Sequence, residues 1–169
     1  MIKKITLAVI AHLISLHAYT QAVDTTALYD FWVGKWEASW DEGNEQVGTG
    51  TNNIVKILDG KVIQENFQIL TGQNKGFKGT SISVFNPRTK EWKQAWADNQ
   101  GGYYDFTGNA DGDKRIFQTT PKNINGKTVI QRMVFYNISN DAFTWDWEGT
   151  QDGGENWNLL WRINYKKSS

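Results

Sequence analysis

Short clusters of Gly, Asn and Asp divide most of the chain into runs of roughly 7–13 residues, and this spacing constrains the fold more than any other feature. Such clusters are typical of tight turns. The runs between them are rich in Val, Ile, Thr, Phe, Tyr and Trp, the residues that favour strands. The pattern predicts ten strands, near residues 35–42, 47–58, 62–70, 77–86, 91–98, 103–109, 114–121, 127–138, 142–150 and 156–167.

Alternation of side chains within the runs also favours strands. Phe143, Trp145 and Trp147 alternate with polar residues, which gives one apolar and one polar face. The exception is residues 24–32, where we expect a short helix with Asp24 or Thr25 as its N-cap.

Ten consecutive strands joined by tight turns, without crossover helices, predict an antiparallel up-and-down meander. An open meander would leave two unpaired edge strands, and closing the sheet into a barrel pairs both. An eight-stranded barrel can already hold one small ligand, and ten strands make a wider one. We therefore expect an all-β barrel, with an open β-sandwich as the alternative.

Residues 1–22 have the features of a secretory signal peptide. A short basic start precedes the uncharged apolar run 5–16, and small residues suited to cleavage near Thr20 or Ala22 follow it. The run is shorter than the roughly 20 residues that span a bilayer, which disfavours a membrane anchor. We predict export to the periplasm or the extracellular space, no membrane span, and a single domain over residues 23–169.

Removal of this segment would leave a chain without His or Cys, because His12 and His17 both lie within it. Two of the 18 Lys and Arg residues also leave, so 16 remain against 18 Asp and Glu. A nearly neutral chain lacks the basic surface that nucleic acids require. Ser-His-Asp triads, Cys-His pairs and thiolate or imidazole metal sites are excluded. We expect no metal, no cofactor and no nucleic-acid partner.

Gly34-Lys35-Trp36, directly after the short helix, resembles the G-x-W signature of the lipocalin–calycin superfamily. In that superfamily the tryptophan plugs the closed end of the barrel. Longer segments resemble the uncharacterised secreted lipocalin-like proteins of bacteria, namely residues 31–40, 57–67, 83–96 and 132–165. The resemblance implies a calycin-like barrel and no known activity. Related haem-binding barrels of the nitrobindin type use an axial histidine, which residues 23–169 lack, so haem binding is not expected.

Three aligned residues of the first strand, Trp36, Ala38 and Trp40, are expected to face the interior. Trp36 would form the floor of the barrel, and Trp40 would lie higher on its wall. Alternatively, both rings only fill the core, where aromatic side chains contribute strongly anywhere.

Three polar side chains lie on strand faces that are otherwise apolar: Glu65, Gln94 and Arg132. A buried charge is costly unless it is paired. If these faces point inward, Glu65 and Arg132 are either partners or groups that contact a ligand. The alternative places them on the outside or in structural pairs.

The register of one hairpin decides where Arg132 points. A two-residue turn would place Tyr136 opposite Trp145 and Arg132 opposite Gly149, which matches apolar with apolar residues. A shift by one residue would place Arg132 opposite Glu148 and exchange the faces of one strand. We prefer the first register, which leaves a niche at Gly149 where a ligand carboxylate could meet the guanidinium.

These features predict a binding protein for a small, mostly hydrophobic or aromatic molecule held inside the barrel. The walls would be formed by aromatic side chains, namely Trp40, Trp96, Tyr104, Tyr136 and Trp145. Glu65, Gln94 and Arg132 would orient the ligand.

Two other functions are compatible with the same residues. An enzyme of isomerase, cyclase or lyase type would use Glu65 as its catalytic base, with a pKa raised by burial. A platform for carbohydrate or protein would instead expose Trp92, Trp157 and Trp161 side by side.

Overall fold

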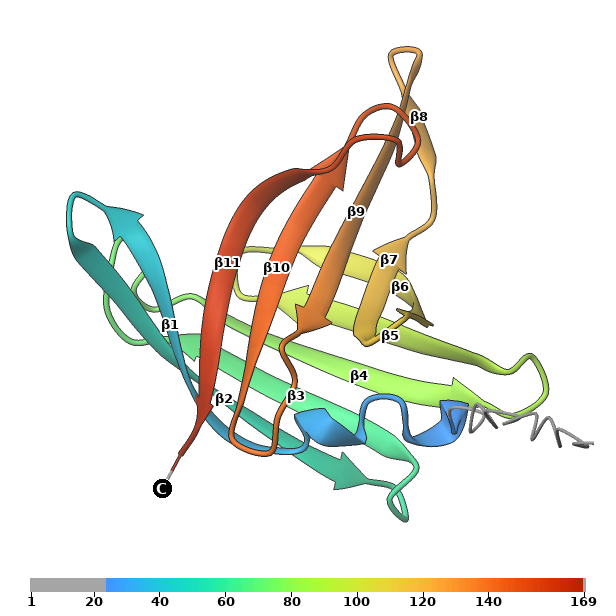
Figure 1. The fold of residues 1–169 in the computed structure, drawn as a ribbon, viewed down its shortest axis with the longest axis horizontal. Coiled ribbons are helices and arrows are strands. Elements are labelled where there is room, and N and C mark those ends of the chain that lie inside the picture. The colour runs from blue at the N-terminus through green and yellow to red at the C-terminus, as the bar shows by residue number, and fades with distance from the viewer. Residues whose placement is uncertain (1–23, 169) are drawn as a thin grey trace, which may run out of the picture.

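The computed structural model describes residues 24–168, and the predicted signal peptide lies outside this range. Two 3-10 turns are followed by eleven β-strands (Figure 1). The turns are η1 (Thr25–Ala27) and η2 (Asp30–Trp32). The strands are β1 (Gly34–Gly43), β2 (Gln46–Ile57), β3 (Val62–Ile69), β4 (Lys78–Asn86), β5 (Glu91–Asp98), β6 (Tyr103–Asp111), β7 (Lys114–Thr119), β8 (Lys122–Ile124), β9 (Lys127–Tyr136), β10 (Ala142–Thr150) and β11 (Asn158–Lys167).

Ten of these strands close into an antiparallel barrel, which confirms the predicted fold class. Consecutive strands pair from β1 to β7. β7 then pairs with β9, β9 with β10, and β10 with β11. The last strand then pairs with the first, with Ala38 opposite Tyr165. β8 pairs only with β9, and it extends that hairpin (Figure 1).

All ten predicted strands are present, with ends that differ from the prediction by two residues at most. The sequence does not predict β8, because a three-residue strand whose side chains are all exposed carries no alternation. The expected short helix is present as η1 and η2. Asp24 caps η1, since its Oδ1 accepts a hydrogen bond from the Thr26 amide at 2.9 Å.

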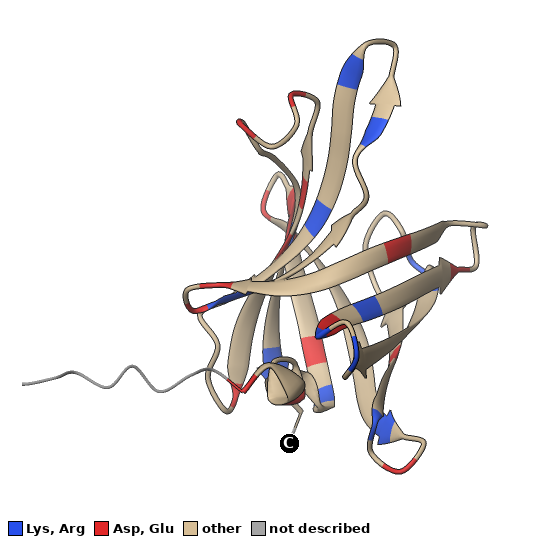
Figure 2. Cartoon of the chain, turned by 90° about the vertical axis from the view of Figure 1, so that its right-hand side faces the viewer, with Lys and Arg blue, Asp and Glu red and all other residues tan. Residues whose placement is uncertain are grey.

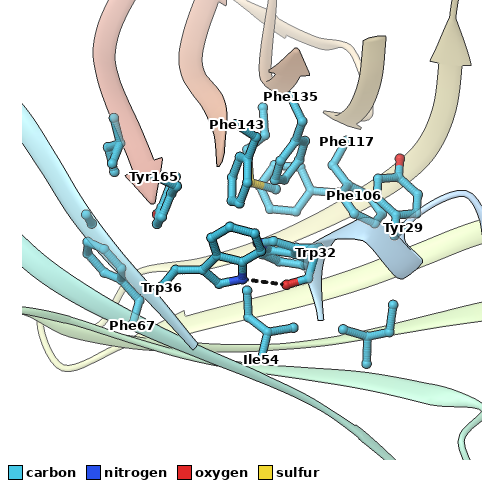
Figure 3. Close-up of a cluster of buried hydrophobic side chains, with 14 of the residues drawn as sticks. Tyr29, Trp32, Trp36, Ile54, Phe67, Phe106, Phe117, Phe135, Phe143 and Tyr165 are labelled. Carbon is cyan, nitrogen blue, oxygen red and sulfur yellow. Dashed lines mark hydrogen bonds between the residues drawn. The ribbon is translucent and has the colours of Figure 1, made fainter. Parts of the chain in front are cut away.

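Large apolar side chains close one end of the barrel (Figure 3). Tyr29 and Trp32, from the segment of 3-10 turns, are buried together with Trp36 of β1. The Trp36 indole N–H donates to the Trp32 carbonyl oxygen at 2.8 Å, which ties β1 to η2. Tyr29 stacks on Phe117 with ring centroids 4.2 Å apart, and its hydroxyl donates to the Ile116 carbonyl oxygen at 2.6 Å. Trp36 is therefore part of the floor, as predicted.

Glycines on the inner face provide the space for large rings higher in the barrel. A Cβ atom at Gly48 would collide with the indole of Trp40, and one at Gly79 would collide with the indole of Trp96. Trp40 is buried and faces inward, as expected. The glycines at these two positions therefore leave room for the Trp40 and Trp96 indoles against the neighbouring strands.

The β9–β10 hairpin adopts the register that the sequence analysis did not prefer. Arg132 lies opposite Glu148, and Trp145 lies opposite Phe135. The preferred pairing of Arg132 with Gly149 is therefore wrong. Consequently Phe135 faces the core and Arg132 faces outward.

Loop length explains this correction. Residues 137–141 join the two strands, and Asn137 adopts a φ of 51° within the loop. The Ser139 amide donates to the Ala142 carbonyl oxygen at 2.9 Å, which closes the loop. A loop with an odd number of residues shifts the pairing by one relative to a two-residue turn, and this shift exchanges the faces of one strand.

Charged residues of both signs are interspersed over the strands and turns (Figure 2). No helix within residues 24–168 has the length and apolarity that a bilayer crossing requires.

We predict that adding one methyl group at Gly108 destabilises the barrel. A Cβ atom there would lie 2.7 Å from Phe117 and 2.7 Å from the Tyr29 hydroxyl, and both residues are fully buried. Gly108→Ala should therefore lower the free energy of unfolding by about 1–3 kcal/mol. Urea titration followed by far-UV circular dichroism measures this change.

Gly149→Ala is the matched control for this substitution. Its nearest neighbour would be Leu160 at 3.2 Å, and the Leu160 side chain is exposed and free to move. Stability should change by less than about 0.5 kcal/mol. Equal losses in the two variants would contradict the packing described for the floor.

Candidate functional site

A cavity of about 190 Å³ lies inside the barrel, on the side of the aromatic floor that faces away from the 3-10 turns. An engineered protein cavity of about 150 Å³ holds benzene, whereas pockets for drug-sized ligands measure about 300–1,000 Å³. The cavity therefore suits a molecule about as large as one aromatic ring.

Two larger hollows lie elsewhere. One, of about 510 Å³, covers polar residues on the outer faces of β2, β3 and β4, among them Thr51, Asn66 and Thr80. The other, of about 460 Å³, lies beside the loop that contains Gln73 and Asn74. The interior cavity is the stronger candidate, because it combines an apolar lining with a buried ionisable group.

Four indole rings line the cavity: Trp96 of β5, Trp145 and Trp147 of β10, and Trp161 of β11. Trp145 and Trp161 meet nearly at right angles, with centroids 5.8 Å apart and planes inclined by 88°. Tyr104 of β6 meets Trp147 in the same manner, at 5.6 Å and 80°. In these edge-to-face pairs, neighbouring ring planes in the cavity wall stand nearly at right angles to each other.

The remaining lining is also mostly aromatic. Phe67, Phe106 and Tyr165 come from three further inner-face positions, and Phe77 comes from the segment before β4. Met133 and Ile163 complete the apolar surface.

Two of the inward indoles are fixed by a carboxylate two residues later in the chain. Trp96 Nε1 donates to Asp98 Oδ2 at 3.2 Å, and Trp40 Nε1 donates to Glu42 Oε1 at 3.1 Å. Asp98 itself lines the cavity. Its limited burial tends to raise the pKa of that carboxyl, but hydrogen bonds from the Gly102 and Gln100 amides outweigh this effect and lower the pKa. Asp98 is therefore a carboxylate near neutral pH.

The indole N–H groups of Trp145, Trp147 and Trp161 have no hydrogen-bond partner among the described residues. These three rings therefore differ from Trp96, whose N–H is already satisfied.

Glu65 of β3 lies against the cavity and is only 6 % exposed. Asn52 Nδ2 donates to Glu65 Oε1 at 2.7 Å, and Ser81 Oγ donates to Glu65 Oε2 at 2.7 Å. Burial raises the pKa of Glu65 from 4.5 to about 7, against the smaller lowering effect of these two hydrogen bonds. The side chain therefore exchanges a proton near neutral pH, which suits a hydrogen-bond donor, a proton acceptor or a counter-charge.

Tyr165 of β11 is a titratable neighbour of Glu65 in the cavity wall. Burial, and then the negative charge of Glu65, raise the pKa of the Tyr165 hydroxyl. Tyr165 thus remains neutral wherever Glu65 titrates.

Four of the eight residues predicted to bind the ligand line the cavity: Glu65, Trp96, Tyr104 and Trp145. Two more, Trp40 and Gln94, face the barrel interior but do not line the cavity. The Trp40 ring packs edge-on against Trp161, with centroids 5.2 Å apart, and Gln94 Nε2 donates to Ser83 Oγ at 2.9 Å.

The other two, Arg132 and Tyr136, lie on the outer wall, contrary to expectation. Arg132 Nε contacts Glu148 Oε2 at 2.6 Å, and its guanidinium stacks 3.7 Å from the centre of the Trp157 ring. Tyr136 donates to Asp146, which also binds Arg162 through two hydrogen bonds. Since the register of β9 turns both side chains outward, neither can orient a ligand in the interior.

The three indoles of the predicted platform do not lie side by side on the surface. Trp92 is buried, and its Nε1 donates to the Thr25 carbonyl oxygen at 2.7 Å. Trp157 is half-buried beneath Arg132, and Trp161 lines the cavity.

Several lining residues are missing from the sequence prediction. Trp147 shares the inner face of Trp145 by simple alternation, so the same pattern identifies it. Phe77 lies in a connection, where alternation gives no information. Asp98 follows Trp96 by two residues, and its polar character disguises its inward position.

Within residues 24–168, no three Asp or Glu side chains lie close enough together to hold a metal ion.

Comparison with known proteins gives a family and no named relative. Residues 27–167 match the family model described as "Protein of unknown function (DUF1579)". No curated protein matches the chain.

We predict that ionisation of Glu65 destabilises the protein as the pH rises. The pKa of Glu65 is higher in the folded state (about 7) than its ordinary value of 4.5, so the folded state binds the proton more tightly. The contribution of Glu65 to stability is then greatest below pH 4.5, decreases between pH 4.5 and about 7, and is constant above that. The decrease should be about 3 kcal/mol.

Glu65→Gln is the reference for this measurement, because glutamine can retain both hydrogen bonds and does not titrate. The difference in unfolding free energy between wild type and variant, from urea titrations between pH 4.5 and 8, isolates the contribution of Glu65. A difference that does not change with pH would show that Glu65 ionises normally.

Proposed function

The chain belongs to the DUF1579 family of proteins of unknown function, and we propose that its barrel binds one small, mostly hydrophobic or aromatic molecule in its interior. The observation that supports this proposal is the cavity of about 190 Å³, lined by rings around one buried carboxyl group.

The contrast between floor and cavity supports ligand binding rather than simple core packing. Trp36 and Tyr29 pack closely and satisfy their polar atoms at the closed end. Trp145, Trp147 and Trp161 are only partly buried and enclose free volume. Protein interiors are otherwise packed as densely as organic crystals, so a void surrounded by indoles indicates space kept for a ligand.

We also propose that the protein is an exported, calycin-like barrel. The signal-peptide pattern of residues 1–22 supports export. Gly34-Lys35-Trp36, with Trp36 in the floor, supports the calycin assignment.

Substitution of a lining ring should weaken binding, and substitution of its neighbour should not. Tyr104 lines the cavity, whereas Tyr103 is 69 % exposed on the same strand. For benzyl alcohol or benzylamine, Tyr104→Ala should lower the affinity about tenfold, because one aromatic wall is lost. Tyr103→Ala should leave the affinity unchanged.

Titration of intrinsic Trp fluorescence, checked by calorimetry, measures both affinities. If neither probe changes the fluorescence or releases heat with the wild-type protein, the proposed binding function is rejected.

A second candidate function is catalysis by Glu65. A buried carboxyl group with a pKa of about 7 can remove a proton near neutral pH, which is the property required of a general base. The surrounding rings would hold a flat substrate, and the carboxylate would act on an acidic C–H or O–H group. This arrangement fits isomerase, cyclase or lyase chemistry.

A nitrobenzisoxazole tests this candidate without knowledge of the natural substrate. The carboxylate would remove the ring C–H proton, the N–O bond would break, and a coloured nitrophenolate would form. We expect the rate to increase with pH and to level off above about pH 7, as Glu65 ionises. Glu65→Gln should lower the rate at least about 100-fold.

Asp105→Asn is the control, because Asp105 is exposed on β6. Its rate should equal that of wild type. A Glu65→Gln variant as fast as wild type would eliminate the catalytic candidate and leave the binding proposal intact.

A further inference from the structure

Resting on the proposed binding function, we infer that the ligand is a small organic cation, an amine or a quaternary ammonium group, held between indole rings and the carboxylates of Glu65 and Asp98. This inference goes further than a hydrophobic ligand, because it assigns a sign of charge to the molecule that the cavity accepts.

The charges of the cavity are of one sign. Glu65 and Asp98 are its charged lining residues, and no Lys or Arg is among the described residues that line it. Arg132 and Arg162 lie on the outer wall, where Glu148 and Asp146 respectively already pair with them.

The nearest inward arginine belongs to the closed end of the barrel. Arg115 of β7 lies opposite Phe135, and its Nε donates to the Leu28 carbonyl oxygen at 3.2 Å. Arg115 does not line the cavity. Its guanidinium instead binds the segment of 3-10 turns. Nothing described in the cavity wall would neutralise Glu65 or Asp98.

The aromatic lining provides the second half of the recognition. A cation within about 6 Å of a ring centroid is attracted by the ring face, most strongly by that of Trp. Trp145 and Trp161 stand at 88° to each other, and Tyr104 and Trp147 stand at 80°. Perpendicular walls of this kind present ring surface to one small volume from several directions, which is the arrangement of cages for ammonium groups.

A neutral apolar ligand would not offset the free-energy cost of burying the Glu65 carboxylate. Its carboxylate is held by two neutral donors, Asn52 and Ser81, at 2.7 Å each. Filling the cavity with hydrocarbon would remove the remaining solvent from this carboxylate and disfavour its charge further. A cation would offset that cost by direct attraction.

Two matched pairs of probes test the sign of charge. Choline is compared with dimethylbutanol, its neutral carbon isostere, and benzylamine is compared with benzyl alcohol. At pH 8 we expect each cation to bind at least about tenfold more tightly than its neutral partner. Affinities are measured by Trp fluorescence titration and calorimetry on the wild-type chain.

The pH dependence connects this preference to Glu65. Asp98 and the tyrosines Tyr104 and Tyr165 share the cavity with Glu65. Asp98 is already charged at pH 5.5, because its pKa is lowered, and burial raises the pKa of Tyr165, so its hydroxyl stays neutral over this range. With a pKa of about 7 for Glu65, cation affinity should fall roughly 30-fold between pH 8 and pH 5.5. The neutral probes should not follow this curve.

Two variants of equal charge change serve as the internal comparison. Glu65→Gln should reduce the preference and abolish the pH dependence, while far-UV circular dichroism and urea titration report whether it is folded. Asp105→Asn removes one negative charge from the exposed side of β6 and should bind choline as wild type does.

The outcomes separate this inference from the function on which it rests. A cation preference that requires Glu65 supports the inference. If the neutral member of each pair binds as tightly as the cation, or alone, the inference is overturned and the binding function stands. If no probe of either pair binds, both are rejected.

Discussion

Closure of the sheet by the pairing of β11 with β1 is the constraint on which the interior depends. A closed barrel of ten strands is wider than an eight-stranded barrel, whose interior is just wide enough for side chains to fill. The chain fills the closed end with the 3-10 segment, where Tyr29 and Trp32 meet Trp36. That segment occupies only one end, so the other end retains the cavity. The cavity is thus a consequence of barrel size and of where the N-terminal segment stops.

The sequence predicts those features that depend on local periodicity. Strand positions follow from turn residues and alternation, and Glu65 stands out because a charge interrupts an alternating apolar face. The side of the sheet to which Arg132 belongs depends instead on whether a loop has an odd or even number of residues, and composition does not determine this number. Phe77 illustrates a second limit, since a residue outside the strands reaches the cavity through the path of the backbone.

The same limits explain why only half of the predicted site residues line the cavity. Trp40 and Trp96 occupy equivalent positions in the pattern, each with a glycine on the neighbouring strand and a carboxylate two residues later. Only the Trp96 ring borders the free volume, whereas Trp40 supports Trp161 from behind. Distinguishing the two requires the three-dimensional arrangement of rings from distant strands, and one strand's sequence does not contain it.

Glu65 gives the clearest reason to regard the cavity as functional. Its burial costs stability whenever it is ionised, because Asn52 and Ser81 supply hydrogen bonds and no opposing charge. A glutamine would accept the hydrogen bond from Asn52 and donate one to the Ser81 hydroxyl oxygen, without that cost. A carboxyl group is therefore useful at this position only if its proton or its negative charge is used. A second molecule in the cavity would make use of either, so the residue that weakens the fold also supports the proposed ligand site.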